Sequence, residues 1–272
     1  MAAFKAGNVL ITGANRGLGF EMVKQLLEVP CPKWQIFAGC RDPDGPKSEA
    51  LRELVKKHPS VITIIGLDVA DPCSIKESAK KVGSLLGKNS LNMLVNNAAV
   101  LASGSMMTIP AEDMQNTFNT NVMGPLLVIR EYLPYLQTAA KARGTSGMSC
   151  DKAAVINISS TGGSITSMPS MYTQFPVLPY SVSKAGLNML TALIAVELKP
   201  DEILCMALHP GWVRTDMGGE EVSVGSITTK LMFLKAPLEA RESVEGMLRV
   251  ISSLTENEHG GFMDYTGQTL PW

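Results

Sequence analysis

The sequence predicts an α/β protein in which residues 1–272 form a single domain, a Rossmann-type doubly wound parallel sheet of about seven strands. Short apolar runs, typical of strands buried in a parallel sheet, alternate with segments of helical periodicity. A glycine-rich turn follows the first strand, and no internal repeat or change in composition divides the chain. Because strand and helix patterns alternate without a break, one doubly wound domain accounts for the whole sequence.

The pattern places the elements in a regular order. We expect strands at 9–11, 34–39, 61–67, 91–95, 154–158, 203–208 and 261–264. We expect helices at 20–27, 48–57, after 71–72, at 111–137 and at 181–198, and a surface loop at 138–152. Ligands of such sheets bind beyond the carboxyl ends of the strands, so the residues at those ends are the first candidates for a site.

The glycine-rich turn follows the strand at 9–11 and carries Gly13, Gly17 and Gly19. Helical periodicity begins directly after it, so the turn points backbone N–H groups and the positive end of a helix at one place. The spacing Gly-x-x-x-Gly-x-Gly is a variant of the dinucleotide-binding fingerprint. A purely structural turn is the alternative, but the position between a strand and an amphipathic helix favours a phosphate-binding loop.

Two arginines indicate which dinucleotide the turn binds. An NAD site usually has a carboxylate at the end of the second strand, but here Cys40 and Arg41 occupy that place. Arg16 lies within the glycine-rich turn, and two guanidinium groups suit a 2′-phosphate. We therefore expect NADP(H) rather than NAD, the alternative being that both arginines are solvated surface charges.

The composition argues against several classes of protein. A formal net charge of −1, with no block of lysine or arginine, is unlike a nucleic-acid-binding protein. We expect no secretory signal, and no membrane span because no run approaches ~20 apolar residues. The five cysteines are odd in number and scattered, which predicts reduced thiols and a cytoplasmic protein. The three histidines are scattered as well, so we expect no metal site.

The candidate catalytic pair is Tyr180 and Lys184, which share one face at the start of a helix. A nearby cation favours the phenolate, so such a tyrosine can exchange a proton with an alcohol or carbonyl oxygen. Ser160 follows the neighbouring strand, and its hydroxyl can donate to the same oxygen. Tyr172 is a weaker candidate because Pro176 stands where its lysine partner would be.

Short motifs follow one another in a fixed order: Thr12-Gly-Ala-Asn-Arg-Gly-Leu-Gly19, Asn96-Asn-Ala98, Asn121, Ser160, Tyr180 with Lys184, and Pro210-Gly211. Together they resemble the short-chain dehydrogenase/reductase family over nearly the whole chain. The segments His209-Pro-Gly-Trp-Val-Arg-Thr-Asp216 and Asp264-Tyr-Thr-Gly-Gln-Thr-Leu-Pro-Trp272 are similar to the sniffer/C-factor branch of small carbonyl reductases.

The resemblance implies catalytic roles for four residues. Tyr180 is the general acid in reduction, and Lys184 lowers its pKa and holds the nicotinamide ribose. Ser160 polarises the substrate carbonyl, and Asn121 holds a water that links Lys184 to solvent.

The resemblance also implies how the cofactor lies. Asp68 and Val69 contact the adenine, Asn97 and Ala98 the adenosine side, and the turn 210–215 the nicotinamide end. The residues expected to bind the cofactor are Gly13, Asn15, Arg16, Gly17, Leu18, Gly19, Arg41, Asp68, Val69, Asn97, Ala98, Tyr180, Lys184, Pro210, Gly211, Val213 and Thr215.

The sequence departs from the family pattern at two places. Ala99 stands where glycine usually follows Asn-Asn-Ala, and the separation of Ser160 from Tyr180 is longer than usual. The enlarged loop 161–179 is apolar and rich in proline, so we interpret it as part of an apolar substrate wall. Packing on its own core or on a partner subunit is an equally good interpretation. Residues 217–235 are a candidate lid.

Three functions remain open. The first is an NADPH-dependent reductase of small carbonyl compounds, and the others are a C-factor-type dinucleotide sensor and an NAD-dependent alcohol or steroid dehydrogenase. The long apolar helices at 111–137 and 181–198 and the family resemblance favour a homodimer or homotetramer. We interpret Asp216 and the charges around Lys47 as surface groups, and His209 as part of its turn.

Overall fold

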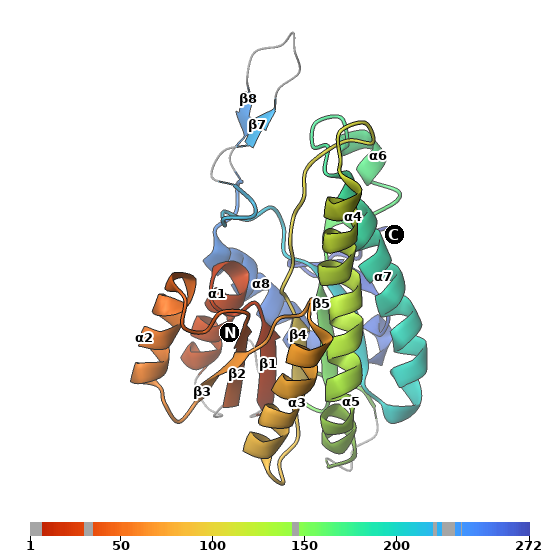
Figure 1. Cartoon of the computed structure of the whole chain (residues 1–272). Coiled ribbons are helices and arrows are strands. Elements are labelled where there is room, and N and C mark those ends of the chain that lie inside the picture. The colour runs from red at the N-terminus through yellow and green to blue at the C-terminus, as the bar shows by residue number, and fades with distance from the viewer. Residues whose placement is uncertain (1–6, 30–34, 143–146, 220–221, 225–231, 235) are drawn as a thin grey trace.

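The computed structural model describes residues 7–29, 35–142, 147–219, 222–224, 232–234 and 236–272. Its centre is a parallel sheet of 7 strands in the order β3-β2-β1-β4-β5-β6-β9, with helices on both faces (Figure 1). The strands are β1 Asn8–Thr12, β2 Gln35–Cys40, β3 Ile62–Gly66, β4 Met93–Asn96, β5 Ala154–Ile158, β6 Leu204–His209 and β9 Phe262–Asp264. The doubly wound fold class is confirmed, and the chain crosses from β3 past β1 to β4 at the point where the strand order reverses.

Strand alternation divides the core into two layers, because successive side chains point to opposite faces of a sheet. Val9, Ile11 and Ile156 face α1 (Gly17–Glu28), α2 (Glu49–Lys57) and α8 (Ala240–Ser253). Leu10 and Val155 face α3 (Pro72–Leu86), α5 (Gly124–Ala142) and α7 (Leu178–Leu198), which run side by side in Figure 1. Both faces of the strands are therefore apolar, as the unbroken apolar runs predicted.

The expected helix at 111–137 is wrong in one respect, since it is three consecutive elements. It consists of α4 (Ala111–Phe118), a π-helical turn (Asn119–Met123) and α5 (Gly124–Ala142). The first residue of α5 allows a close approach, because a Cβ on Gly124 would lie 2.7 Å from the Val69 carbonyl oxygen. The π turn inserts Asn121 at the point where the helix passes the ends of the strands.

Other boundaries also need correction. The predicted loop at 138–152 is helical as far as Ala142, where α5 ends. The helix predicted from residue 181 begins at Leu178 with Pro179 in its first turn, so Tyr180 is inside it. Sequence analysis assigned neither α8 nor the short helix α6 (Met168–Met171), nor the hairpin of β7 (Val222–Val224) and β8 (Met232–Leu234).

The long helix α7 also bears on the expected absence of a membrane span. Among the described residues, Leu178–Asp201 is long and apolar enough to cross a membrane by length and composition. One side of α7 packs on the sheet through Ile194, Ala195 and Leu198, and 44% of the apolar window is buried.

Candidate active site

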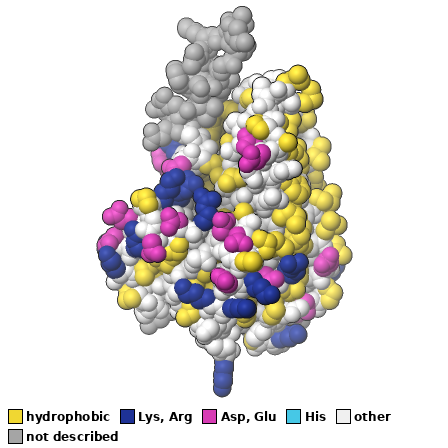
Figure 2. Space-filling model, viewed as in Figure 1, with side chains coloured by type: hydrophobic (Ala, Val, Ile, Leu, Met, Phe, Trp, Pro, Cys, Tyr) yellow, Lys and Arg dark blue, Asp and Glu magenta, His cyan; other side chains and the backbone are white. Residues whose placement is uncertain are grey.

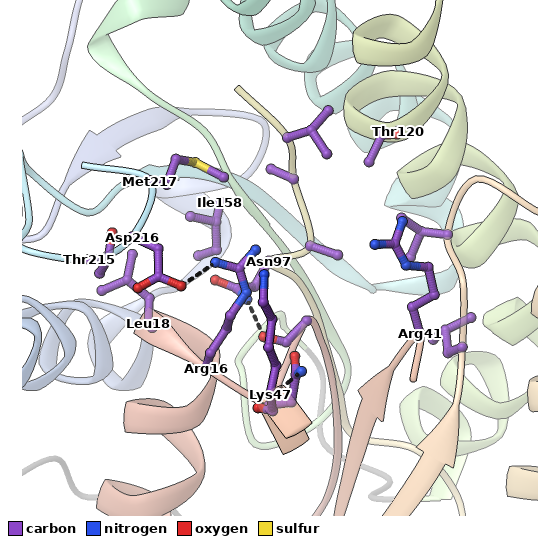
Figure 3. A pocket seen from close by; sticks show the side chains of 18 of the residues that line it. Arg16, Leu18, Arg41, Lys47, Asn97, Thr120, Ile158, Thr215, Asp216 and Met217 are labelled. Carbon is purple, nitrogen blue, oxygen red and sulfur yellow. Dashed lines mark hydrogen bonds and ion pairs between the residues drawn. The ribbon is translucent and has the colours of Figure 1, made fainter. Parts of the chain in front are cut away.

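A pocket of about 480 Å³ lies beyond the carboxyl ends of β1 to β6, where the sheet topology places ligand sites (Figure 3). Most of the residues predicted from the sequence line it. These are Gly13, Asn15, Arg16, Gly17, Leu18, Arg41, Asp68, Val69, Asn97, Ala98, Tyr180, Lys184, Pro210 and Thr215. The structure therefore brings together residues from the ends of five strands and from the start of α7.

Five predicted residues are not part of this lining: Gly19, Asn121, Ser160, Gly211 and Val213. Gly211 has φ +82, and a Cβ there would lie 2.9 Å from Leu238 Cδ2, so the position favours glycine for reasons of packing. Val213 is buried and forms an isolated bridge with Leu238. The turn after β6 reaches the pocket through Pro210 and Thr215 instead.

The glycine-rich turn is held by close backbone contacts. Gly13 and Gly17 have φ +65 and +54, and a Cβ on Gly19 would lie 2.3 Å from the Gly13 carbonyl oxygen. Asn97 Nδ2 donates to the carbonyl oxygens of Thr12 at 2.9 Å and Gly13 at 3.2 Å. Asn97 therefore fixes the turn from the neighbouring strand end. At the three glycine positions of the turn, glycine is the residue that fits.

The start of α1 is suited to an anion. The first turn of α1 contains no acidic residue, and its N-cap residue Arg16 makes no side-chain capping hydrogen bond. The first N–H groups of a helix have no partner inside the helix, and they attract phosphate groups. The residues present therefore fit the pyrophosphate of a dinucleotide, whose approach a side chain at Gly13 or Gly17 would obstruct.

The two predicted arginines lie in different surroundings. Arg41 lines the pocket at the end of β2, well apart from Arg16 in Figure 3. Arg16 Nη1 instead forms an ion pair with Asp216 Oδ2 at 2.7 Å. Lys47 also lines the pocket, between the two arginines in this view.

Lys47 and Asp216 are exposed, as expected of surface charges, but both also line the pocket, which the sequence analysis did not predict. Lys47 comes soon after the end of β2, and Asp216 follows the Pro-Gly turn after β6. Their place after a strand end is the signal that could have identified them, because that edge of the sheet carries the ligands.

Asp68 and Val69, expected near the adenine, form the wall after β3. Asp68 Oδ1 accepts a hydrogen bond from the Ala70 N–H at 3.0 Å, and Ser74 Oγ accepts one from the Asp68 N–H at 2.9 Å. The Asp68 turn is thus shaped by its own hydrogen bonds, and Val69 is buried against it.

Tyr180 and Lys184 meet as the helical spacing predicted. Lys184 Nζ lies 5.6 Å from the centre of the Tyr180 ring and donates a 2.7 Å hydrogen bond to the Ile158 carbonyl oxygen. The Ser160 hydroxyl is hydrogen-bonded to the Tyr180 side chain. The Tyr180 phenol, the Ser160 hydroxyl and the Lys184 amine therefore lie close together, after the end of β5 and at the start of α7.

Burial governs the titration of this cluster. Burial raises the pKa of the Tyr180 phenol, and its hydrogen bond with Ser160 offsets part of that rise. Burial also lowers the pKa of Lys184 to about 7. Desolvation disfavours the charged form of both groups, and the expected lowering of the Tyr180 pKa by Lys184 stays a prediction.

Asn121 connects the π turn to the site. Its Nδ2 donates to the Val100 carbonyl oxygen and to Ser183 Oγ, each at 2.9 Å, and its Oδ1 accepts from the Val100 N–H at 2.9 Å. These contacts fix the segment after β4 against α7. The expected water link to Lys184 stays a prediction.

The enlarged loop 161–179 packs on several other segments. The Pro176 carbonyl oxygen accepts from the Gly104 N–H at 2.7 Å, and Phe175 lies edge-on to Trp212 at 5.5 Å between ring centres. The Trp272 carbonyl oxygen accepts from the Thr166 N–H at 2.9 Å. The loop thus joins the segment after β4, the turn after β6 and the end of the chain.

The candidate lid at 217–235 is described only in part. Met217 lines the pocket, and 222–224 pair with 232–234 as an antiparallel hairpin. Residues 220–221, 225–231 and 235 lie outside the described residues.

Comparison with known proteins gives the family. The family profile described as "short chain dehydrogenase" matches residues 7–224 of this chain. The chain belongs to the short-chain dehydrogenase family. The glycine-rich turn, Ser160 and the Tyr180–Lys184 pair all lie within the matched residues.

Three relatives show where in the family it falls. NADPH-bound carbonyl reductase from chicken fatty liver is 41% identical with a TM-score of 0.91, over 100% of this chain and 96% of that one. Carbonyl reductase Sniffer of D. melanogaster is 34% identical with a TM-score of 0.86, over 98% of this chain and 100% of that one. C-signal of Myxococcus xanthus is 35% identical, over 67% of this chain and 93% of that one. This short-chain dehydrogenase thus resembles the Sniffer-type carbonyl reductases, as expected.

Proposed function

We propose that this short-chain dehydrogenase uses NADPH to reduce a small, apolar ketone or aldehyde to an alcohol. The observation that carries the proposal is the cluster of Ser160, Tyr180 and Lys184 beside a pocket whose other end is a glycine-rich phosphate turn. The likeness to the NADPH-bound chicken carbonyl reductase and to Sniffer supports both the cofactor and the class of substrate.

The cofactor supplies a hydride to the carbonyl carbon of the substrate. Tyr180 donates its phenolic proton to the carbonyl oxygen, so the product is a neutral alcohol and the phenol becomes a phenolate. The raised pKa of Tyr180 keeps the phenol protonated at neutral pH, which is the state that reduction requires. The Ser160 hydroxyl donates a hydrogen bond to the same carbonyl oxygen, and protonated Lys184 stabilises the phenolate that forms.

The experiment is NADPH oxidation over a panel of aliphatic and aromatic ketones and aldehydes, with Tyr180→Phe beside the parent. We expect kcat to fall by about 10²- to 10⁴-fold because the proton donor is lost, while the Kd of NADPH stays the same. Tyr172→Phe is the matched control, since Tyr172 has no lysine partner and should leave kcat unchanged. Comparable rates for Tyr180→Phe and the parent would remove the proposed proton donor.

NADPH is proposed as the preferred dinucleotide. Arg41 and Lys47 both line the pocket, and Cys40 and Arg41 hold the last position of β2 and the position after it. Asp42 lines the pocket as well, and its Oδ1 accepts a hydrogen bond from the Gly45 N–H at 3.0 Å. A guanidinium can bind the 2′-phosphate through two parallel hydrogen bonds. Fluorescence titration should give a lower Kd for NADPH than for NADH, and a preference for NADH would instead favour the NAD-dependent alcohol or steroid dehydrogenase.

A dinucleotide sensor is the second candidate, favoured by the 35% identity with C-signal. Its distinguishing outcome is a protein that binds NADPH and turns over no carbonyl compound of the panel. Ser160, Tyr180 and Lys184 argue against it, since binding alone does not need the three together.

A homodimer or homotetramer is the proposed assembly. Apolar side chains of α7 at Val182, Met189, Leu193 and Val196 are exposed, and they recur at helical spacing. Figure 2 shows hydrophobic side chains along the side of the molecule where α7 lies. A patch of this kind is typical of an interface, and a second copy of the chain offers the same apolar helix in return. Light scattering should give a dimer or tetramer for the parent and a monomer for Leu193→Glu.

The cytoplasmic location stays a prediction from the reduced cysteines. Among the described cysteines, Cys40, Cys73 and Cys205 form no disulfide.

A further inference from the structure

His209 is a buried titratable residue that the proposed reaction does not use. It is the last residue of β6, beside β5, which leads directly into Ser160. Its ring faces the turn that follows that serine: His209 Nδ1 accepts a hydrogen bond from the Thr161 N–H at 3.3 Å, and Nε2 lies 3.5 Å from Thr161 Oγ1.

The turn after Ser160 has two N–H groups at its start that need acceptors. The Gly162 N–H donates to Ser160 Oγ at 3.0 Å, and the Thr161 N–H donates to His209. A buried N–H without an acceptor is costly, so the imidazole decides whether this turn keeps its shape. Because Ser160 Oγ accepts the Gly162 N–H, its own proton is left to be donated to Tyr180 or to a substrate oxygen.

The far side of the same turn is held by α7. Asn188 accepts from Ser159 Oγ at 2.5 Å and donates to the Gly163 carbonyl oxygen at 3.3 Å. A Cβ on Gly163 would lie 2.5 Å from the Lys184 carbonyl carbon, so the turn lies directly against the helix that carries the catalytic pair. His209 is thus the contact that fixes the turn from the side of the sheet.

Only a neutral imidazole can accept at Nδ1, and then the ring proton lies on Nε2 toward Thr161 Oγ1. Burial of the ring favours that state and outweighs the carboxylate of Asp264, which favours a charged ring. Lys184 lies near and disfavours a second positive charge. Asp264 faces His209 in the strand register, but its Oδ1 accepts from Thr266 and Gln268 in its own turn.

We propose that His209 is a positioning residue for Ser160: its neutral Nδ1 holds the Thr161 N–H and so fixes the direction of the serine hydroxyl. The proposal rests on the function proposed above, in which Ser160 polarises the substrate carbonyl. Burial of the ring, which lowers the pKa of His209 to about 4, keeps the acceptor available throughout the neutral range. A positively charged ring would lose this acceptor and repel Lys184.

The first test compares His209→Asn with His209→Gln, two variants of the same chemistry and different length. The Asn carbonyl oxygen takes the place of Nδ1 and can accept the Thr161 N–H, whereas the Gln oxygen extends toward the place of Nε2. We expect kcat to fall roughly 10- to 100-fold in the Gln variant and to stay within about threefold of the parent in the Asn variant. The Kd of NADPH should not change in either. Equal kcat values for the two variants would overturn the proposal.

A double-mutant cycle separates positioning from general damage. If His209 acts through Ser160, then His209→Gln should slow the Ser160→Ala protein far less than it slows the parent. Equal fold-losses in both backgrounds contradict the proposal, because the two residues would then act independently.

Hydrogen exchange gives a reading that does not depend on activity. The peptide spanning 159–164 should exchange faster in the Gln variant than in the parent, and at the parent rate in the Asn variant. If Tyr180→Phe keeps full activity, the proposed reaction fails, while this exchange difference would still support the hydrogen bond. If exchange is the same in all three proteins, the His209 contact is not what holds the turn and the proposal fails.

Discussion

The two ends of the pocket are built in different ways. At the glycine-rich end, one turn is fixed by backbone contacts closer than a side chain allows, with Asn97 bonded to two of its carbonyl oxygens. Near Tyr180, the segment after β4 and the loop 161–179 pack on each other, as in the 2.7 Å hydrogen bond from the Gly104 N–H to the Pro176 carbonyl oxygen. In the segment after β4, Met106 and Met107 are exposed at 78% and 83%. The glycine-rich end tolerates few residue types because its backbone contacts leave no room for a side chain. The end near Tyr180 tolerates many residue types because it is shaped by side chains.

The largest effect is expected from a substitution at the glycine-rich end of the pocket. Gly19→Ala places a Cβ 2.3 Å from the Gly13 carbonyl oxygen and 2.6 Å from Asn97 Nδ2, so the turn must open. We expect the free energy of unfolding to fall by about 1–3 kcal/mol. The Kd of NADPH should rise by about tenfold or more.

The control is Gly66→Ala, in a strand that also belongs to the cofactor half. Its Cβ would meet only Pro43 Cγ at 3.8 Å, so both the stability and the NADPH Kd should stay near the parent values. Equal results for the two alanine variants, by chemical denaturation and fluorescence titration, would show that the close contacts at residue 19 do not constrain the turn.

The second effect concerns Lys184, where the two ends meet. Its folded pKa is about 7, against about 10.4 for a free lysine, so the unfolded chain holds a proton in this range that the folded chain lacks. The free energy of unfolding therefore gains a contribution that rises with pH above 7, by at most ~1.4 kcal/mol per pH unit. Below pH 7 both states are protonated, and this contribution is constant.

Lys184→Met removes that titration and keeps the length of the side chain. We expect the difference in unfolding free energy between parent and variant to grow in favour of the parent from pH 7 to pH 9, by about 1–2 kcal/mol. Urea denaturation at half-unit steps measures it. Parallel curves for the two proteins would mean that the lysine is charged in the folded protein throughout this range.

The contrast between the ends explains what the sequence could predict. Buried parallel strands have to be apolar on both faces, and close turns have to be glycine, so the strands and Gly13, Gly17 and Gly19 were identified from residue types alone. Tyr180 and Lys184 were paired because helical spacing alone places them on one face. All of these constraints act within a few residues of the chain.

The errors share a different cause, since each depends on contacts between distant segments. The π turn at Asn119–Met123 arises where Gly124 meets Val69, which no local pattern shows. Asp216 lines the pocket with Arg16, a residue 200 positions earlier in the chain. By contrast, α8 has apolar residues at helical spacing and was a readable element that the sequence analysis did not assign.

A third, smaller effect is expected from a substitution at the end of the pocket near Tyr180. Phe175 contacts Trp212 edge-on, and Phe175→Ala removes that contact from the loop proposed as the substrate wall. We expect the KM for aromatic ketones to rise by about threefold to tenfold, equivalent to roughly 0.5–1.5 kcal/mol, with an unchanged NADPH Kd. Met107→Ala, at an exposed site of the same end, is the control. An unchanged KM would favour the other interpretation, in which the loop packs only on its own core or on a partner.

The smallest expected effect lies at the Arg16–Asp216 ion pair, which joins the glycine-rich turn to the turn after β6. Both side chains are largely exposed, at 46% and 71%, so Asp216→Asn should change the free energy of unfolding by less than about 1 kcal/mol. The variant frees the Arg16 guanidinium and adds positive charge to the pocket, which should lower the Kd of NADPH about twofold to fivefold at low salt and less at high salt. Titration of NADPH and NADH at two ionic strengths separates the possibilities. Tighter binding of NADPH alone would indicate that Arg16 contacts the 2′-phosphate. Equally tighter binding of NADPH and NADH would place Arg16 near the pyrophosphate. Weaker binding would mean that the intact ion pair itself helps to hold the dinucleotide.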